Sequence, residues 1–195
     1  MRQNRLLTPK LQRAFTLIEL LITITVLGVL MAIALPNLRD FVVSNRLSSQ
    51  VNGFIGLINY ARSEAIVRNQ SVLVCAKRAV DNECSTAEFW GNLETQVFVD
   101  VDGNNSWSTG DILLKRIAAL DLTENETTFK KRNSTAPSFI EFSASGLARN
   151  PYQFSIHAVS ADSAYEVKYG RTVCISRSGR ARVSSLTLTG LCPVF

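Results

Sequence analysis

The sequence predicts an α+β protein, with one long N-terminal helix followed by a small domain of antiparallel strands. The chain has 195 residues, which allow one ordinary domain and an appendage. Apolar residues recur at helical spacing up to about residue 68, and from residue 69 the pattern changes to short runs with a period of two. Charged residues make up 19% of the chain, below the roughly 25% of an average soluble domain, which favours a membrane-associated part.

The first element is a basic leader, residues 1–14. It contains four positive charges and no acid, so the rest of the chain is close to neutral although the whole has a net charge of +5. The basicity of the whole protein is therefore no argument for nucleic-acid binding.

The second element is an apolar segment, residues 15–36. From Phe15 to Leu35 the sequence has a single charge, Glu19, and the ~20 residues that a helix needs to cross the hydrocarbon core. The basic leader is expected to stay in the cytoplasm by the positive-inside rule, which sends everything after the segment to the outer side. We predict a single-pass membrane helix.

The helix is expected to continue as an amphipathic segment, residues 37–68. One face carries apolar residues at steps of three and four, namely Leu38, Phe41, Val42, Val51, Phe54, Ile55, Ile58, Ala61, Ala65 and Ile66. The alternative is a secretory signal cut after the small residues Ala32-Ile33-Ala34. We favour the helix because the apolar run is longer than an ordinary signal, contains a charge and continues its periodicity past that cut.

Residues 69–195 are predicted to form an exported β-domain. Turn-forming clusters of Gly, Asn, Asp and Ser separate the alternating runs. The candidate strands are residues 71–77, 96–100, 112–117, 139–143, 153–158, 171–176 and 181–189. The stretch from Asp121 to Pro137 is polar and basic in its middle, which predicts a solvated loop.

The four cysteines form an even set in a domain expected outside the cytoplasm, where disulfides persist. Three pairings are open, and we favour Cys75 with Cys84 and Cys174 with Cys192 because each closes a local loop. A metal site is the alternative, but the sequence has no C-x-x-C spacing and one histidine, so we expect no metal.

Enzyme motifs are missing from the sequence. It has no nucleophile elbow, phosphate loop or paired catalytic carboxylates, so we expect neither catalysis nor a cofactor. His157 alternates with apolar neighbours and is interpreted as structural. The run from Asp100 to Asp111 is similar to the start of a calcium loop but has Asn105 where such loops have Gly, and a plain hairpin turn explains it equally well.

The segment Arg13-Ala14-Phe15-Thr16-Leu17-Ile18-Glu19-Leu20 resembles the cleavage and methylation motif of type IV pilins and type II secretion pseudopilins. The resemblance implies that prepilin peptidase cuts between Ala14 and Phe15, that Phe15 is N-methylated, and that the protein starts in the bacterial inner membrane and enters a filament. A buried carboxylate is costly in lipid unless it is paired. The new amine of a neighbouring subunit's Phe15 is therefore the expected partner of Glu19 in assembly.

Further motifs resemble the GspH/FimT group of minor pilins and pseudopilins. They are Ala61-Arg62-Ser63-Glu64-Ala65-Ile66 with Arg68-Asn69-Gln70, Val97-Phe98-Val99-Asp100 with its Gly/Asn-rich turn, and Ile140-Glu141-Phe142 before Gly146. The resemblance implies a type IV pilin-like fold, with the helix packed on two antiparallel sheets, and a minor subunit that assembles with other pilins.

The end of the domain is locally basic. After Glu166 the sequence has no Asp or Glu, while Lys168, Arg171, Arg177, Arg180 and Arg182 follow within fifteen residues. Gly179-Arg180-Ala181-Arg182 also resembles the Gly-Arg-x-Arg motif of FimT-type pilins that bind DNA in natural transformation. Ser178-Gly179 is expected to be a two-residue hairpin turn with Arg177 and Arg180 at its base.

Two functions remain open from the sequence. The first is a minor pilin that binds double-stranded DNA non-specifically through this basic hairpin for DNA uptake. The second is a structural subunit at the tip of a pilus, or a GspH-like pseudopilin of type II secretion, that binds other pilins and no DNA. An exported enzyme held by the helix is the third and least favoured class.

Overall fold

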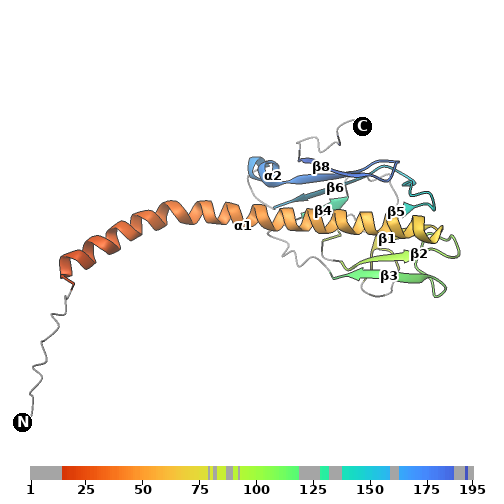
Figure 1. Ribbon diagram of the computed structural model, residues 1–195, viewed down its shortest axis with the longest axis horizontal. Coiled ribbons are helices and arrows are strands. Elements are labelled where there is room, and N and C mark those ends of the chain that lie inside the picture. The colour runs from red at the N-terminus through yellow and green to blue at the C-terminus, as the bar shows by residue number, and fades with distance from the viewer. Residues whose placement is uncertain are drawn as a thin grey trace, which may run out of the picture. The chain divides into compact units, whose positions relative to one another are not determined.

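The computed structural model of the chain describes residues 15–78, 80, 83–86, 90–91, 93–118, 128–131, 138–158, 163–186 and 192 (Figure 1). The chain divides into two compact units, Met1–Val42 and Val43–Phe195. Helix α1, Leu17–Arg68, contributes residues to both units. Each unit is described by itself.

The part of α1 in the first unit is apolar and exposed. The window Leu17–Ala34 has a mean hydropathy of 2.5, and its length and composition are sufficient to cross a membrane. The helix begins with a capping box, because the Glu19 amide donates to Thr16 Oγ1 at 3.3 Å while Glu19 Oε2 accepts from the Thr16 amide at 2.9 Å. Glu19 thus has a hydrogen-bond partner in its own chain.

The second unit contains two four-stranded antiparallel sheets and a short helix. One sheet has the order β3-β2-β1-β5, and the other has the order β4-β6-β7-β8. The strands are β1 (Val72–Ala76), β2 (Thr95–Val99), β3 (Ile112–Ile117), β4 (Thr128–Lys131), β5 (Phe139–Phe142), β6 (Tyr152–His157), β7 (Arg171–Ile175) and β8 (Ala181–Ser185), and α2 spans Ser163–Tyr169. The implied helix on two antiparallel sheets is confirmed.

One hydrophobic core joins α1 to both sheets. Phe54 of α1 and Trp90 each contact the Phe154 ring edge-on, with ring centroids 5.0 Å apart in both pairs. The buried face of α1 consists of Leu47, Val51, Phe54, Leu57, Ile58, Ala61 and Ala65. Leu38, Phe41, Val42 and Ile66, which the periodicity places on that face, are exposed. The buried face of α1 begins at Leu47, after the first three of them, and ends at Ala65, one residue before Ile66.

Two elements were missed by the sequence analysis. The predicted loop from Asp121 to Pro137 contains strand β4, which pairs with β6 with Thr128 opposite His157. Helix α2 falls between two predicted strands and has only seven residues, too few for its periodicity to show. Strand β8 ends at Ser185, and the predicted extension over residues 187–189 lies outside the described residues.

Candidate functional site

The predicted arginine motif, residues 179–182, begins in the turn between β7 and β8 and ends on β8. We call the turn, residues 176–180, the arginine turn. The Ser176 amide donates to Arg180 O at 3.0 Å, and the Gly179 amide donates to Ser176 O at 2.9 Å. Gly179 has a φ of 73°, so the connection is a three-residue hairpin loop closed by a left-handed glycine. The expected two-residue turn was wrong, because Arg177 lies within the loop and not at its base.

The strand register places Arg182 on the face of the sheet opposite to the core. Ala181 pairs with Ile175 and packs against the core, whereas Arg182 pairs with Cys174 and is exposed. Side chains two residues apart on a strand leave the same face, about 6.6 Å apart. Arg180 is also exposed, but it ends the turn and lies one residue before β8, so the strand register fixes the face of Arg182 alone. The shared face of Arg180 and Arg182 stays a prediction.

Arg171 and Lys168 are not gathered with the arginine turn. Arg171 Nη1 donates to Tyr169 O at 3.2 Å and to Gly170 O at 2.9 Å, and the residue pairs with Ser185 at the other end of the hairpin. Lys168 lies on α2 with its Nζ 4.8 Å from the centre of the Tyr169 ring. Arg171 is the first residue of β7, which extends about 13 Å to Ile175 before the arginine turn begins. The basic stretch of sequence is therefore two groups in space.

A second turn of the same construction lies against the arginine turn. In residues 143–147 the Ser143 amide donates to Leu147 O at 2.9 Å and the Gly146 amide to Ser143 O at 2.7 Å, again with a positive φ of 74° at Gly146. Both turns have the sequence Ser-x-Ser-Gly, and in both the two serine hydroxyls pair, at 3.0 Å here and 2.8 Å in the arginine turn. This repeated tetrapeptide was visible in the sequence and was missed.

Glycine at position 179 is required by packing as well as by backbone conformation. A Cβ placed there would lie 2.2 Å from Gly146 O and 2.8 Å from Nε of Arg62. The helix residue Arg62 therefore lies beside the arginine turn, although no local pattern in the sequence connects residue 62 with residue 179.

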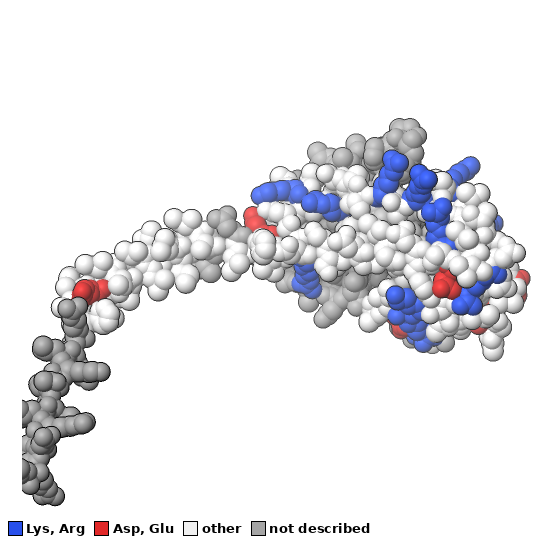
Figure 2. All heavy atoms as spheres, viewed as in Figure 1, with Lys and Arg blue, Asp and Glu red and all other residues white. Residues whose placement is uncertain are grey.

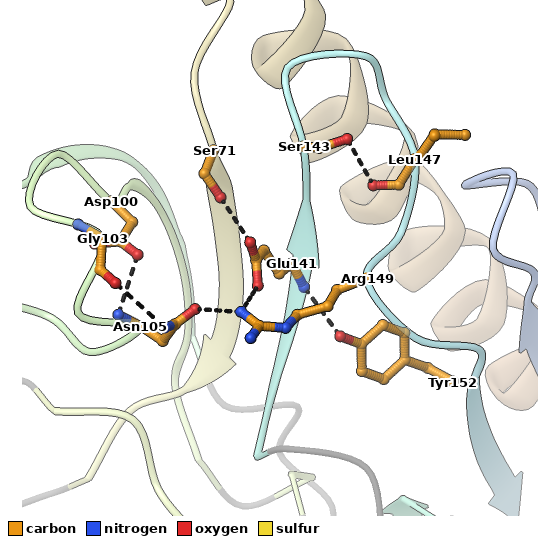
Figure 3. Close-up of polar contacts among 9 residues, drawn as sticks. All are labelled: Ser71, Asp100, Gly103, Asn105, Glu141, Ser143, Leu147, Arg149 and Tyr152. Carbon is orange, nitrogen blue, oxygen red and sulfur yellow. Dashed lines mark hydrogen bonds and ion pairs between the residues drawn. The ribbon is translucent and has the colours of Figure 1, made fainter.

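The acidic loop after β2 is closed by its own hydrogen bonds (Figure 3). Asp100 accepts from the amides of Gly103 at 3.0 Å and Asn105 at 3.1 Å, and Asn105 accepts from Arg149 Nη1 at 3.1 Å. Burial raises the pKa of the Asp100 carboxyl, and the amide of Asn104 lowers the pKa of the Asp102 carboxyl. Carboxylate oxygens of Asp100, Asp102 and Asp111 lie within 4.8 Å of one another. The hydrogen bonds that Asp100 and Asp102 accept from backbone amides are those of a plain turn. The calcium alternative stays a prediction.

His157 is half-buried at the end of β6. Its Nδ1 lies 3.3 Å from Ala158 O and 3.8 Å from Glu166 Oε2 on α2. These contacts join a strand to the short helix beside it, which fits the structural role expected for the residue.

The cysteines are joined as expected from the sequence, Cys75 to Cys84 and Cys174 to Cys192, with Cα–Cα distances of 5.5 and 5.9 Å. Cys75 belongs with Leu73 and Phe98 to a small cluster apart from the main core, so its bridge holds Cys84 on the side of the β3-β2-β1-β5 sheet that faces away from that core. Cys174 pairs with Arg182, so the second bridge holds residue 192 on the face that carries Arg182.

Removal of the second disulfide should destabilise the domain. Changing Cys174 and Cys192 together to Ala opens a loop of sequence separation 18, which is worth about 3 kcal/mol of stability through the entropy of the unfolded chain. The midpoint of thermal unfolding followed by near-UV circular dichroism should fall. Non-reducing peptide mapping of the unaltered protein should recover 75–84 and 174–192 as linked pairs, and crossed pairs would contradict the assignment.

Two family models match the chain, and a fimbrial protein is similar to part of it. The model described as "Type II transport protein GspH" matches residues 50–179, and the "Prokaryotic N-terminal methylation motif" matches residues 9–35. The fimbrial protein EcpC of Eikenella corrodens is 46% identical over 43 residues, which are 22% of this chain and only 28% of that protein.

Solved structures show a similar fold. The type IV minor pilin FimU of Pseudomonas aeruginosa superposes with a TM-score of 0.52 at 20% identity, over 72% of this chain and 89% of that chain. A second crystal form of FimU gives a TM-score of 0.49 at 20% identity over 70% and 91%. Because the first family model covers more than half of the chain, this protein belongs to the GspH family, and it is of the minor type IV pilin or pseudopilin type.

Proposed function

We propose that this protein is a minor type IV pilin that binds double-stranded DNA non-specifically through the arginine turn and the start of β8, for DNA uptake in natural transformation. The observation that carries the proposal is the exposure of three arginines close together in the chain, Arg177 and Arg180 in the turn and Arg182 at the start of β8. Arginine suits this role because its planar fork of donors grips phosphate oxygens bidentately.

The charges of the arginine turn differ from those of several other arginines of the domain, which are paired with carboxylates. Arg68 is paired with Glu64, Arg78 with Glu83, and Arg149 with Glu141, at 2.7, 2.8 and 2.8 Å. No ion pair among the described residues involves Arg177 or Arg180. In Figure 2 blue side chains gather over the β8 side of the second unit, and the acidic side chains at its right-hand end lie below them. A positive surface potential attracts phosphate.

Binding of DNA by the whole protein tests the proposal. Full-length protein in detergent micelles should raise the anisotropy of a labelled 30-base-pair duplex, with a dissociation constant of about 1 μM or weaker at moderate salt. With two to four phosphates neutralised, log K should fall against log salt with a slope of roughly −2 to −4. Unrelated duplex sequences should compete equally. Absence of binding at low salt would reject the proposal.

Cleavage and membrane insertion complete the proposed function. Prepilin peptidase would remove residues 1–14 and a methyl group would be added to Phe15, which is 87% exposed in the described chain, whereas Ala14 lies outside the described residues. The N-terminal helix would then hold the subunit in the inner membrane until it joins other pilins, with the β-domain in the periplasm.

The mass of the membrane-extracted protein tests this processing. We expect a chain that starts at Phe15, with the mass of one added methyl group, because the motif predicts a cut before that residue and the helix remains intact after it. Edman sequencing or intact mass spectrometry decides the question, and a chain starting at Leu35 would instead identify a secretory signal.

The description of the matching family model favours a second candidate, a GspH-like minor pseudopilin of type II secretion. Deletion of the gene would then stop secretion of exported enzymes while leaving DNA uptake unchanged. If the protein is a DNA-uptake pilin, deletion should instead stop DNA uptake and leave secretion unchanged.

A further inference from the structure

Helix α1 reaches the arginine turn through one side chain. Arg62 Nε donates to Gly146 O at 2.9 Å, across 84 residues of sequence. The same guanidinium group lies against Gly179, because a Cβ on Gly179 would come within 2.8 Å of Arg62 Nε and 3.1 Å of its Cδ. The helix, the 143–147 turn and the arginine turn therefore meet at one point.

The two turns are held to each other by their backbones. The Ala148 amide donates to Arg177 O at 3.0 Å, and Gly146 O occupies the space where a side chain of residue 179 would begin. Helix α1 also leaves no room for a side chain at Gly146, since a Cβ there would lie 2.7 Å from Cδ1 of Ile66. Both glycines have positive φ, so any side chain is strained at either position.

We propose that Arg62 is a positioning residue for DNA binding: by holding Gly146 against α1 it fixes the arginine turn, so that Arg177 and Arg180 meet the phosphates from a rigid base. The inference rests on the proposed function and extends it to a residue outside the Gly-Arg-x-Arg motif. Arg62 is half-buried, and no ion pair among the described residues involves it.

Arginine is the residue type that this role requires. Its Nε–H lies in the plane of the group and donates sideways to a carbonyl while the apolar stem packs along the backbone. Lysine carries the same charge but has no donor at that position in the side chain. A loose turn would weaken binding, because ordering the long side chains would then cost more entropy at every phosphate contact.

The variants Arg62→Met and Arg62→Lys distinguish a positioning role of Arg62 from a role of its positive charge. Arg68→Met is the matched control, since it removes one positive charge from the same helix, where Arg68 is paired with Glu64. In full-length protein in micelles, we expect both Arg62 variants to bind the labelled duplex about tenfold more weakly, the equivalent of one lost charged hydrogen bond. The Arg68 control should stay within about twofold.

Hydrogen–deuterium exchange of the same samples reports on the turn itself. The Gly179 amide donates a hydrogen bond to Ser176 O. The proteolytic peptide that contains Gly179 should therefore exchange slowly in the wild type and faster in both Arg62 variants. Peptides from β6 and the melting temperature should change little. A change in exchange limited to the two turns is not expected from a general loss of stability.

Three outcomes decide between the accounts. Wild-type affinity in both Arg62 variants, with unchanged exchange at 176–180, overturns the positioning role and leaves the proposed function standing. Full rescue by Arg62→Lys, with a salt slope lowered by about 1 in Arg62→Met alone, also overturns it, since Arg62 would then contact phosphate directly. No binding by the wild type rejects the proposed function, and with it the role of Arg62 in DNA binding.

Discussion

Changing Arg180 and Arg182 together to Gln should lower the affinity for duplex DNA by roughly 30-fold or more. Each substitution removes a charged donor group worth at least about 1 kcal/mol at a phosphate. The salt slope should fall by about 2, because two fewer counterions are released on binding. Both side chains are exposed, so the melting temperature should stay within error of the wild type.

The matched control for this variant removes the same charge from a paired site. Arg68→Gln with Arg149→Gln removes two arginines that are bound to Glu64 and Glu141. Because their charges are offset by carboxylates, we expect affinity to change by less than about threefold. Equal losses in the two double variants would show that net charge alone matters and that the arginine turn is no specific site.

Substitution of Glu19 should abolish incorporation into filaments, the second large effect. The capping box with Thr16 gives Glu19 a role within its own helix, and the expected ion pair with the amine of a neighbouring Phe15 gives it a second role in assembly. Glutamine can complete a capping box as well as glutamate, but it has no charge.

The pair Glu19→Ala and Glu19→Gln distinguishes these two roles. If the charge is what assembly requires, both variants insert in the membrane but are missing from sheared filaments, as judged by immunoblotting. Normal recovery of Glu19→Gln with loss of Glu19→Ala would assign the effect to helix capping. Normal recovery of both would remove Glu19 from the assembly mechanism.

Local patterns in the sequence predicted most of the elements. The helix over 15–68, seven of the strands and the cysteine pairs follow from periodicity and from short loops, which are properties of neighbouring residues. Strand β4 was missed because its polar residues gain their stability from pairing with β6, a contact that the local sequence does not show.

The candidate site could be predicted from the sequence only where it depends on neighbouring residues. The alternation that turns Ala181 to the core and Arg182 to the other face is a local property of a strand, and the register of β8 on β7 agrees with it. The separation of Arg171 from the turn and the contact of Arg62 with Gly146 depend on how distant segments pack. The missed capping box at Thr16 and Glu19 is different, since its T-x-x-E pattern was visible in the sequence.

DNA uptake by cells tests the central claim most directly. In the bacterium that encodes this chain, the chromosomal copy is replaced by the Arg180→Gln, Arg182→Gln variant, and transformation frequency is measured together with the amount of subunit in sheared filaments. The account predicts a large loss of transformation with normal filaments, whereas the Arg68→Gln, Arg149→Gln strain transforms normally. Wild-type transformation by the Arg180→Gln, Arg182→Gln strain would contradict a DNA-binding role for this protein and leave it as a structural subunit.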